Sequence, residues 1–255
     1  HEALIRWHNP TRGFVNPGDF IPVAEASGTI IPIGEWVFRE ACRLLSTELP
    51  GQRVSVNVSP VQFRHPGFLE ALGEIVHRSG VHPGQIELEI TESVLIDDDR
   101  RAQQILRSLK RMGFGVALDD FGTGYSSLSY LSRYPFDTIK LDRRFVANLG
   151  VVNSAEVIVR SIIDLGRGLG MKVVAEGVET IDEAIFLSAS GCNELQGFLF
   201  GRPQPLSQVQ RWCDPMLMSE MRRRLLQADA DRTALANLSR RAEADNPTLP
   251  SAVSA

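Results

Sequence analysis

Short aliphatic segments alternate with longer amphipathic ones along most of the chain. This alternation is typical of βα units around a parallel sheet, because strands covered on both faces are continuously apolar. Seven segments have the strand pattern: residues 2–7, 53–59, 85–91, 114–120, 137–142, 171–177 and 193–200. Five segments between them have the apolar spacing of helices: residues 33–49, 66–80, 99–113, 154–170 and 180–191. Most of these helices end in glycine, as a helix C-terminus should.

The uninterrupted alternation predicts a barrel. Seven strand segments are one short of an eight-stranded (β/α)8, TIM-like barrel, and a chain of 255 residues fits that fold. An open doubly wound sheet is the alternative, but no GxGxxG motif follows the first strand segment. The LGRGLG run at residues 165–170 follows a helix and precedes a strand, so we expect it to end the helix rather than to bind phosphate.

Polar residues stand at or near the C-terminal end of each strand segment. In a (β/α) barrel these ends meet on one face, where active sites form. We therefore expect one pocket to collect Glu2, Asn57, Glu89, Asp119, Asp120, Lys140, Asp142, Glu176 and Gln196. A single acid at a strand end is more often a helix cap or a salt-bridge partner. Acids on so many successive strands indicate a shared site instead.

The carboxylates of this pocket predict a metal centre. They cannot all ionise side by side in a low-dielectric pocket without raised pKa values or bound cations. Oxygen ligands without histidine or cysteine suit Mg²⁺ or Mn²⁺ rather than zinc or copper. The adjacent pair Asp119 and Asp120 suits a second ion, because one carboxylate can bridge two metals about 4 Å apart.

Lys140 is one of three lysines in a chain with 27 basic residues, so its place at a strand end calls for a reason. An ammonium there can hydrogen-bond a catalytic water or a phosphate charge, and pairing with Asp142 is the simpler alternative. The loop at residues 121–128, FGTGYSSL, has the glycines and hydroxyls of a segment that closes over a site. Glu92 is in a position to tether it.

Charge and cysteine content limit the partners and the compartment. A net charge of −4 argues against binding a polynucleotide, although a small nucleotide remains compatible with it. The three cysteines form no CxxC pair, which favours a reducing, cytoplasmic location. No apolar run approaches the roughly 20 residues that span a bilayer. A membrane-attached region elsewhere in a longer protein is compatible with these observations.

The pattern changes near the C-terminus. Residues 1–213 form the expected barrel domain, whereas residues 214–244 have sparse apolar positions at helical spacing and many charges. We expect a charged helical extension there, either solvated or docked on a partner. The last segment, residues 245–255, has the composition of a disordered tail.

Several motifs resemble one known family when they are taken together and in order. They are EALIRW at residues 2–7, NVSPVQF at 57–63, EITES at 89–93, DDFGTGYSSLSYL at 119–131, IKLDRRFV at 139–146, AEGVET at 175–180 and GCNELQGFLFGRP at 191–203. On these motifs the chain resembles the EAL domains, bacterial phosphodiesterases specific for cyclic di-GMP.

The resemblance implies a barrel that uses two divalent cations, Mg²⁺ or Mn²⁺, to hydrolyse cyclic di-GMP to linear 5′-pGpG. It implies Glu2, Asn57, Glu89 and Asp119 as ligands of the first metal, and Asp119, Asp120 and Glu176 as ligands of the second. It further implies that Lys140 orients the attacking water, with Asp119 as the other group that can take the proton. The remaining residues it implies are Asp142 beside the metals, Glu92 on the loop, Glu179 and Gln196 around the site and Arg6 on a substrate phosphate.

The chain departs from the family pattern at its start. Members have one more strand before the EAL motif, with a glutamine that contacts substrate, and this chain opens one residue before the motif. The resemblance also suggests a homodimer and a regulatory domain N-terminal to the barrel. A catalytically silent receptor that binds cyclic di-GMP and signals to a partner is the alternative function, and the complete set of ligand positions favours the enzyme.

Overall fold

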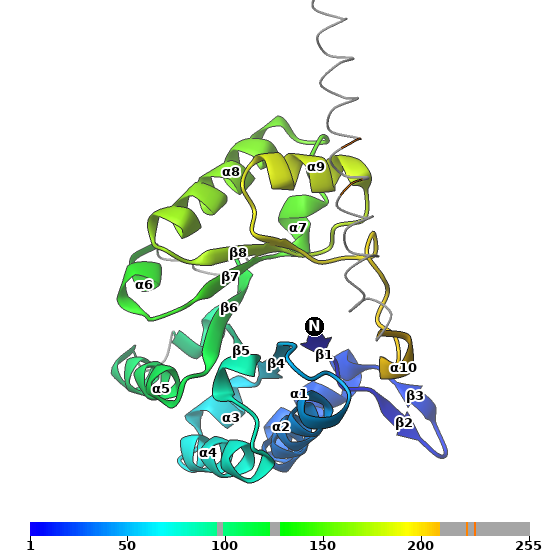
Figure 1. Cartoon of the computed structure of the whole chain (residues 1–255), viewed down its shortest axis with the longest axis vertical. Coiled ribbons are helices and arrows are strands. Elements are labelled where there is room, and N and C mark those ends of the chain that lie inside the picture. Colours follow the sequence, from blue (N-terminus) through cyan, green and yellow to red (C-terminus); the bar gives the residue numbers. More distant parts are fainter. Residues whose placement is uncertain (96–98, 123–127, 210–222, 224–226, 228–255) are drawn as a thin grey trace, which may run out of the picture.

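Seven parallel strands form the main sheet in a computed structural model of the chain, which describes residues 1–95, 99–122, 128–209, 223 and 227. The strands pair in chain order: β1 (Glu2–Ala3), β4 (Val54–Val58), β5 (Ile86–Thr91), β6 (Gly115–Phe121), β7 (Thr138–Leu141), β8 (Lys172–Ala175) and β9 (Glu194–Leu195). The sheet curls into an incomplete barrel with helices on its convex side (Figure 1). The predicted TIM-barrel-like α/β fold is therefore confirmed.

Helices follow most strands and cover the outside of the sheet. They are α1 (Pro17–Ser27), α2 (Ile30–Thr47), α3 (Pro60–Arg64), α4 (Phe68–Ser79), α5 (Asp99–Met112), α6 (Leu128–Arg133), α7 (Arg143–Val146), α8 (Asn153–Gly168), α9 (Ile181–Ala189) and α10 (Leu206–Val209). Two short 3₁₀ turns lie at Pro83–Gln85 and Glu92–Leu95. The LGRGLG run ends α8 as expected, with Gly170 in the left-handed region at φ 73°.

The strands direct apolar side chains to the helices and polar ones to the barrel interior. In β4, Val54, Val56 and Val58 are buried, whereas Ser55 and Asn57 alternate with them and are more exposed. Alternation of this kind places residues two apart on the same face. The interior face therefore carries the polar residues toward the carboxyl ends of the strands.

The first and last strand segments are shorter than predicted. The segment at residues 2–7 is a strand only over Glu2–Ala3, and the segment at 193–200 only over Glu194–Leu195. Trp7 instead begins a two-stranded antiparallel hairpin of β2 (Trp7–Asn9) and β3 (Gly13–Val15). Asn9 closes its turn by accepting hydrogen bonds from the backbone N–H groups of residues 11 and 12. The chain thus leaves the sheet because the Asn-Pro and Gly signals of residues 9–13 form a turn.

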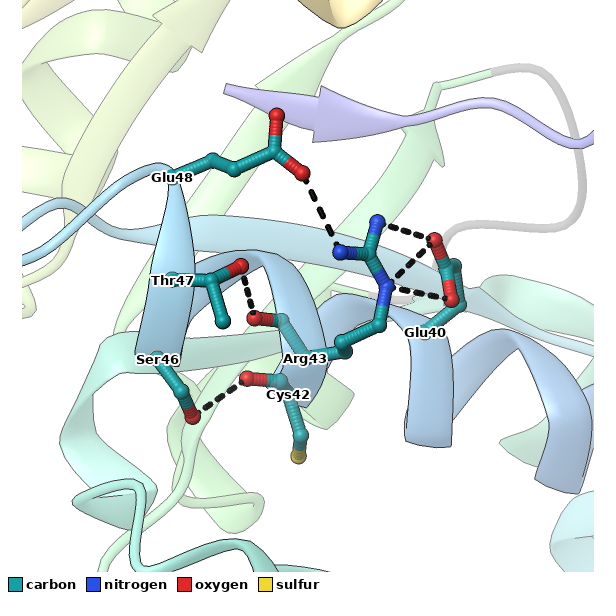
Figure 2. Close-up of polar contacts among 6 residues, drawn as sticks. All are labelled: Glu40, Cys42, Arg43, Ser46, Thr47 and Glu48. Atoms are coloured by element: carbon teal, nitrogen blue, oxygen red, sulfur yellow. Dashed lines mark hydrogen bonds and ion pairs between the residues drawn. The ribbon is translucent and has the colours of Figure 1, made fainter.

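The helix α2 ends in a surface cluster around Arg43 (Figure 2). The Arg43 guanidinium contacts Glu40 at 2.7 Å and Glu48 at 3.1 Å. The hydroxyls of Ser46 and Thr47 donate to backbone carbonyls one turn earlier, each at 2.8 Å. The polar side chains at the solvent-facing end of the helix are therefore bonded to one another or to its backbone.

The barrel is open between its two edge strands. Among the described residues, β1 pairs only with β4 and β9 only with β8. A side-chain hydrogen bond spans this opening, since Gln196 Nε2 donates to Glu2 Oε2 at 2.6 Å. A complete eight-stranded barrel would place one further strand in this opening.

The remaining expectations concern the membrane and the C-terminal segment. Within the described ranges, no helix combines the length and apolar character needed to cross a membrane. The predicted extension at 214–244 lies outside the described residues apart from positions 223 and 227, and the predicted tail at 245–255 lies outside them altogether.

Candidate metal centre

Lys140 occupies the centre of an acidic cluster inside the barrel. It lies on β7, and 3% of the residue is exposed. Its Nζ is 2.6 Å from Glu176, 2.7 Å from Glu89, 3.2 Å from Asp119 and 4.0 Å from Glu2. Four carboxylates from separate strand ends therefore face one ammonium group.

The adjacent acids Asp119 and Asp120 reach the cluster through an irregularity in β6. Successive side chains of a regular strand point to opposite faces. The pairing of β6 with β7 shifts between Leu118 and Phe121, and Asp120 has a left-handed φ of 53°. Carboxylate oxygens of Asp119, Asp120 and Glu176 consequently come within 4.8 Å of one another. Uncommon backbone of this kind is concentrated at functional sites.

Burial raises the pKa of two of these acids. The pKa of Glu89 rises to about 8, since desolvation outweighs the attraction of Lys140 and the charges of Glu2 and Asp119 add to it. The pKa of Glu176 rises to about 6 for the same reasons, again with Lys140 opposing the rise. The site thus holds more negative charge than its own cation neutralises.

The Lys140 ammonium stays protonated in this surrounding. Burial lowers its pKa, but the charges of Glu89, Glu2, Glu176 and Asp119 outweigh that effect and the pKa lies above its ordinary value. A lysine with a raised pKa donates hydrogen bonds and supplies positive charge. It does not act as a base near neutral pH.

Asp120 and Asp142 form a second pair of neighbouring acids. Burial, the charge of Asp119 and the hydrogen bond with Asp142 raise the pKa of Asp120. Burial also raises the pKa of Asp142, but hydrogen bonds from Arg144 outweigh it and leave this pKa below its ordinary value. Arg144 donates to Asp142 Oδ1 from its backbone N–H at 2.8 Å and from Nε at 2.9 Å.

Arg144 is a residue of the site that the sequence analysis did not identify. The simpler interpretation paired Lys140 with Asp142. In the structure the cation beside Asp142 is Arg144 instead. The two arginines that follow Asp142 in the sequence were the available signal. Asp142 also caps α7, which explains why its side chain points to the Arg144 N–H.

The donor set fits a hard divalent cation. Among the described residues, Glu89 Oε2 and Asp119 Oδ1 are buried with no hydrogen-bond partner apart from the facing Lys140 ammonium. Carboxylate oxygens of Asp119, Asp120 and Glu176 lie within 4.8 Å of one another, close enough to bind one ion together. Buried carboxylates in excess of their cations are the situation that a bound Mg²⁺ or Mn²⁺ resolves. These residues could therefore hold a metal ion.

Asn57 and Gln196 border the cluster through Glu2. Asn57 Nδ2 donates to Glu2 Oε1 at 2.7 Å, and Gln196 Nε2 donates to the other oxygen at 2.6 Å. Both oxygens of Glu2 are thus oriented by amides from β4 and from the end of β9. The structure brings these predicted site residues together.

The remaining predicted residues lie around the cluster. Glu92 Oε1 accepts from the backbone N–H of Gly122 at 2.8 Å, which supports the tether expected at the start of the loop. Most of that loop, residues 123–127, lies outside the described residues. The side chains of Glu179 and Arg6 are exposed, and in the described part of the chain neither joins the ion pairs of Lys140.

Fold and site together define a barrel-like α/β protein with an acidic centre at the carboxyl ends of its strands. The sequence model of the EAL domain matches residues 1–203 of the chain. The chain belongs to the EAL domain family.

Two relatives whose names state an activity support this assignment. The chain is 45% identical over 212 residues to the bifunctional diguanylate cyclase/cyclic di-GMP phosphodiesterase MucR of Pseudomonas aeruginosa, covering 82% of this chain and 31% of that protein. It is 41% identical over 214 residues to the cyclic di-GMP phosphodiesterase PdeR of Escherichia coli, covering 83% of this chain and 32% of that protein. The chain spans about a third of the length of both relatives.

A solved structure shows the same fold with a ligand. The phosphodiesterase structure of PaMucR in complex with c-di-GMP superimposes with a TM-score of 0.78 at 45% identity. The match covers 82% of this chain and 86% of that one. The family and the barrel-like fold are therefore established together.

Proposed function

We propose that this chain is a phosphodiesterase domain that hydrolyses cyclic di-GMP to linear 5′-pGpG with two divalent cations, Mg²⁺ or Mn²⁺. The observation that carries the proposal is the buried cluster in which Glu2, Glu89, Asp119 and Glu176 surround a single Lys140. Relatives named as cyclic di-GMP phosphodiesterases, each at least 41% identical to it, support the choice of substrate.

The ligand positions divide into two groups that share Asp119. Glu2, Asn57, Glu89 and Asp119 would hold one cation, and Asp119, Asp120 and Glu176 the other. The convergence of the last three acids within 4.8 Å supports the second group. When bound, the two cations would lower the pKa of a water and neutralise charge on the phosphate and the leaving oxygen.

The chain's own groups orient the reactants. Lys140, held protonated among carboxylates, would donate a hydrogen bond to the attacking water or to a phosphate oxygen. Since its ammonium cannot accept a proton, Asp119 is the better candidate for receiving the proton of that water. Arg6, exposed beyond β1, would contact a substrate phosphate.

Other residues would keep this arrangement in place. Asp142, held by Arg144, positions Asp120, while Gln196 positions Glu2. Glu92 would fix the start of the loop through Gly122, and Glu179 would assist at the rim. Partners outside the direct ligands commonly change metal affinity and activity by about 10–100-fold.

The whole protein would contain more than this domain. The relatives are about three times as long as the matched region, which supports a regulatory domain next to it. We also propose a homodimer and a cytoplasmic location for this domain.

Turnover of cyclic di-GMP by the purified chain tests the proposal. We expect linear pGpG by chromatography with Mg²⁺ or Mn²⁺, and none with a chelator or in Glu2→Ala. Arg43→Ala is the matched control, because its cluster lies on the surface of α2. Binding of cyclic di-GMP without turnover in either metal would contradict the enzyme and favour the receptor alternative.

A further inference from the structure

The helix α1 has no part in the reaction proposed above, yet one of its side chains contacts the residue that follows the strand of Asn57. Ala24 is the single buried residue of this fully described helix, and Val23 is 68% exposed. The next residue, Glu25, accepts a hydrogen bond from the Ser59 hydroxyl, with 2.6 Å between Oε1 and Oγ. A carboxylate acceptor makes this one of the stronger kinds of hydrogen bond.

Ser59 lies at the junction between β4 and α3. Its hydroxyl accepts from the Val61 N–H at 3.2 Å, and its backbone N–H donates to Gln62 Oε1 at 3.3 Å. Gln62 is 5% exposed and packs against Gly34 of α2, where any Cβ would collide with the amide. The junction is therefore fixed by α2 and α3, and Glu25 connects it to α1 as well.

The position of this junction determines where Asn57 lies. Asn57 is two residues before Ser59 on an extended backbone, and its Nδ2 donates to Glu2 Oε1 at 2.7 Å. A displacement of the junction would move Asn57 relative to Glu2. Both residues belong to the proposed ligands of the first cation.

We propose that Glu25 is a positioning residue for the metal centre: through Ser59 it holds the end of β4 and thereby the place of Asn57 beside Glu2. The inference rests on the proposed function for the metal-binding role of Asn57, and it extends that function to a helix outside the site. Because Glu25 acts through Ser59 and the backbone, we expect its removal to weaken Mn²⁺ binding about tenfold, the lower end of the effect of such partners.

The experiment measures Mn²⁺ binding to the full chain by titration calorimetry without substrate. The variants are Glu25→Ala, Glu25→Gln, Ser59→Ala and the double Glu25→Ala/Ser59→Ala. Glu35→Ala is the matched control, because Glu35 pairs with Arg39 on α2 at 3.3 Å and has no contact with Ser59 among the described residues. Thermal unfolding in chelator reports whether each variant is folded.

We expect Glu25→Ala and Ser59→Ala each to weaken Mn²⁺ binding about tenfold, and the double variant to lose no more than either single one. Glu25→Gln keeps an acceptor oxygen and should restore most of the affinity, whereas Glu35→Ala should bind like wild type. At saturating Mn²⁺, hydrolysis by Glu25→Ala should recover, as a role in metal affinity requires.

Wild-type Mn²⁺ affinity in folded Glu25→Ala would overturn the proposal, and so would additive losses in the double variant. If Glu25→Ala does not fold, the Mn²⁺ affinities of Ser59→Ala and Glu25→Gln test the proposal in its place. Failure of the proposed function has a different signature, because wild type would then bind Mn²⁺ without producing pGpG.

Discussion

Two ion-pair clusters in this chain each contain one cation, and they differ in their access to water. On α2, Arg43 contacts Glu40 and Glu48, and all three side chains are between 36% and 50% exposed (Figure 2). Inside the barrel, Lys140 contacts four carboxylates with 4% of its side chain exposed. Both clusters therefore pair one cation with several carboxylates, one in water and the other in the protein interior.

The pKa of Glu40 on α2 and the pKa values of Glu89 and Glu176 inside the barrel shift in opposite directions. The hydrogen bond from Arg43 lowers the pKa of Glu40, because the exposed site adds only a small opposing effect of burial. Burial raises the pKa of Glu89 to about 8 although an ammonium lies 2.7 Å away. The difference comes mainly from burial, which disfavours the ionised acids of the inner cluster. A bound divalent cation would offset that cost. Removal of the cation from each cluster tests this contrast most directly.

The largest effect is expected for Lys140→Met. This variant leaves Glu89, Asp119 and Glu176 without their cation, so the metal-free chain should lose about 3–5 kcal/mol of unfolding free energy. Denaturant unfolding in chelator measures this loss, and hydrolysis of cyclic di-GMP should disappear. Added Mn²⁺ should restore part of the stability. Unfolding free energy equal to that of wild type in chelator would show that the cluster needs no positive charge.

A smaller effect is expected from pH. The pKa of Glu89 in the folded chain, about 8, lies above the ordinary value of 4.5. Between these values the folded state binds more protons than the unfolded state, so the stability of the metal-free chain should fall as pH rises. A cation needs the ionised carboxylates of Glu89 and Glu176, so stabilisation by Mn²⁺ should grow between about pH 6 and pH 8.

Thermal unfolding with and without Mn²⁺ at several pH values measures this dependence. Glu89→Gln serves as the control and should reduce this dependence, because the amide does not titrate and only Glu176 of the two acids remains. A stabilisation by Mn²⁺ that is independent of pH in wild type would argue that the acids of the site are already ionised without metal.

The smallest effect is expected for Arg43→Ala. Exposed ion pairs contribute little to stability, so the unfolding midpoint and the Mn²⁺ affinity should stay close to those of wild type. Arg43→Lys separates the loss of charge from the loss of the forked geometry. If Arg43→Ala destabilised the chain as strongly as Lys140→Met, burial would not be the difference between the clusters.

Much of the architecture could be predicted because long periodic segments dominate it. The buried strands β5 and β6 are apolar runs in the sequence, so both were predicted. Glu89 and Asp119 lie near their C-terminal ends, where a parallel barrel places its site. The hairpin of β2 and β3 and the helix α1 were not predicted. Their strands are three residues long and α1 buries one side chain, so apolar periodicity carries little signal there.

The local geometry of the site could not be predicted from the sequence. The residues around Asp119 and Asp120 indicate metal ligands, but the left-handed φ of Asp120 depends on how β6 pairs with β7. The pairing of Asp142 with Arg144 rather than with Lys140 depends on the cap of α7. Charge and order in the sequence identify such residues, whereas their partners are decided by packing.

The hydrogen bond between Glu2 and Gln196 has a consequence for synthesis of the protein. It joins positions 194 residues apart, and Glu2 also belongs to the proposed metal ligands. Contacts of such sequence separation form only after the intervening loops have closed. A growing chain on the ribosome therefore cannot complete this centre until nearly the whole barrel has been made, so unfinished molecules should lack the proposed phosphodiesterase activity.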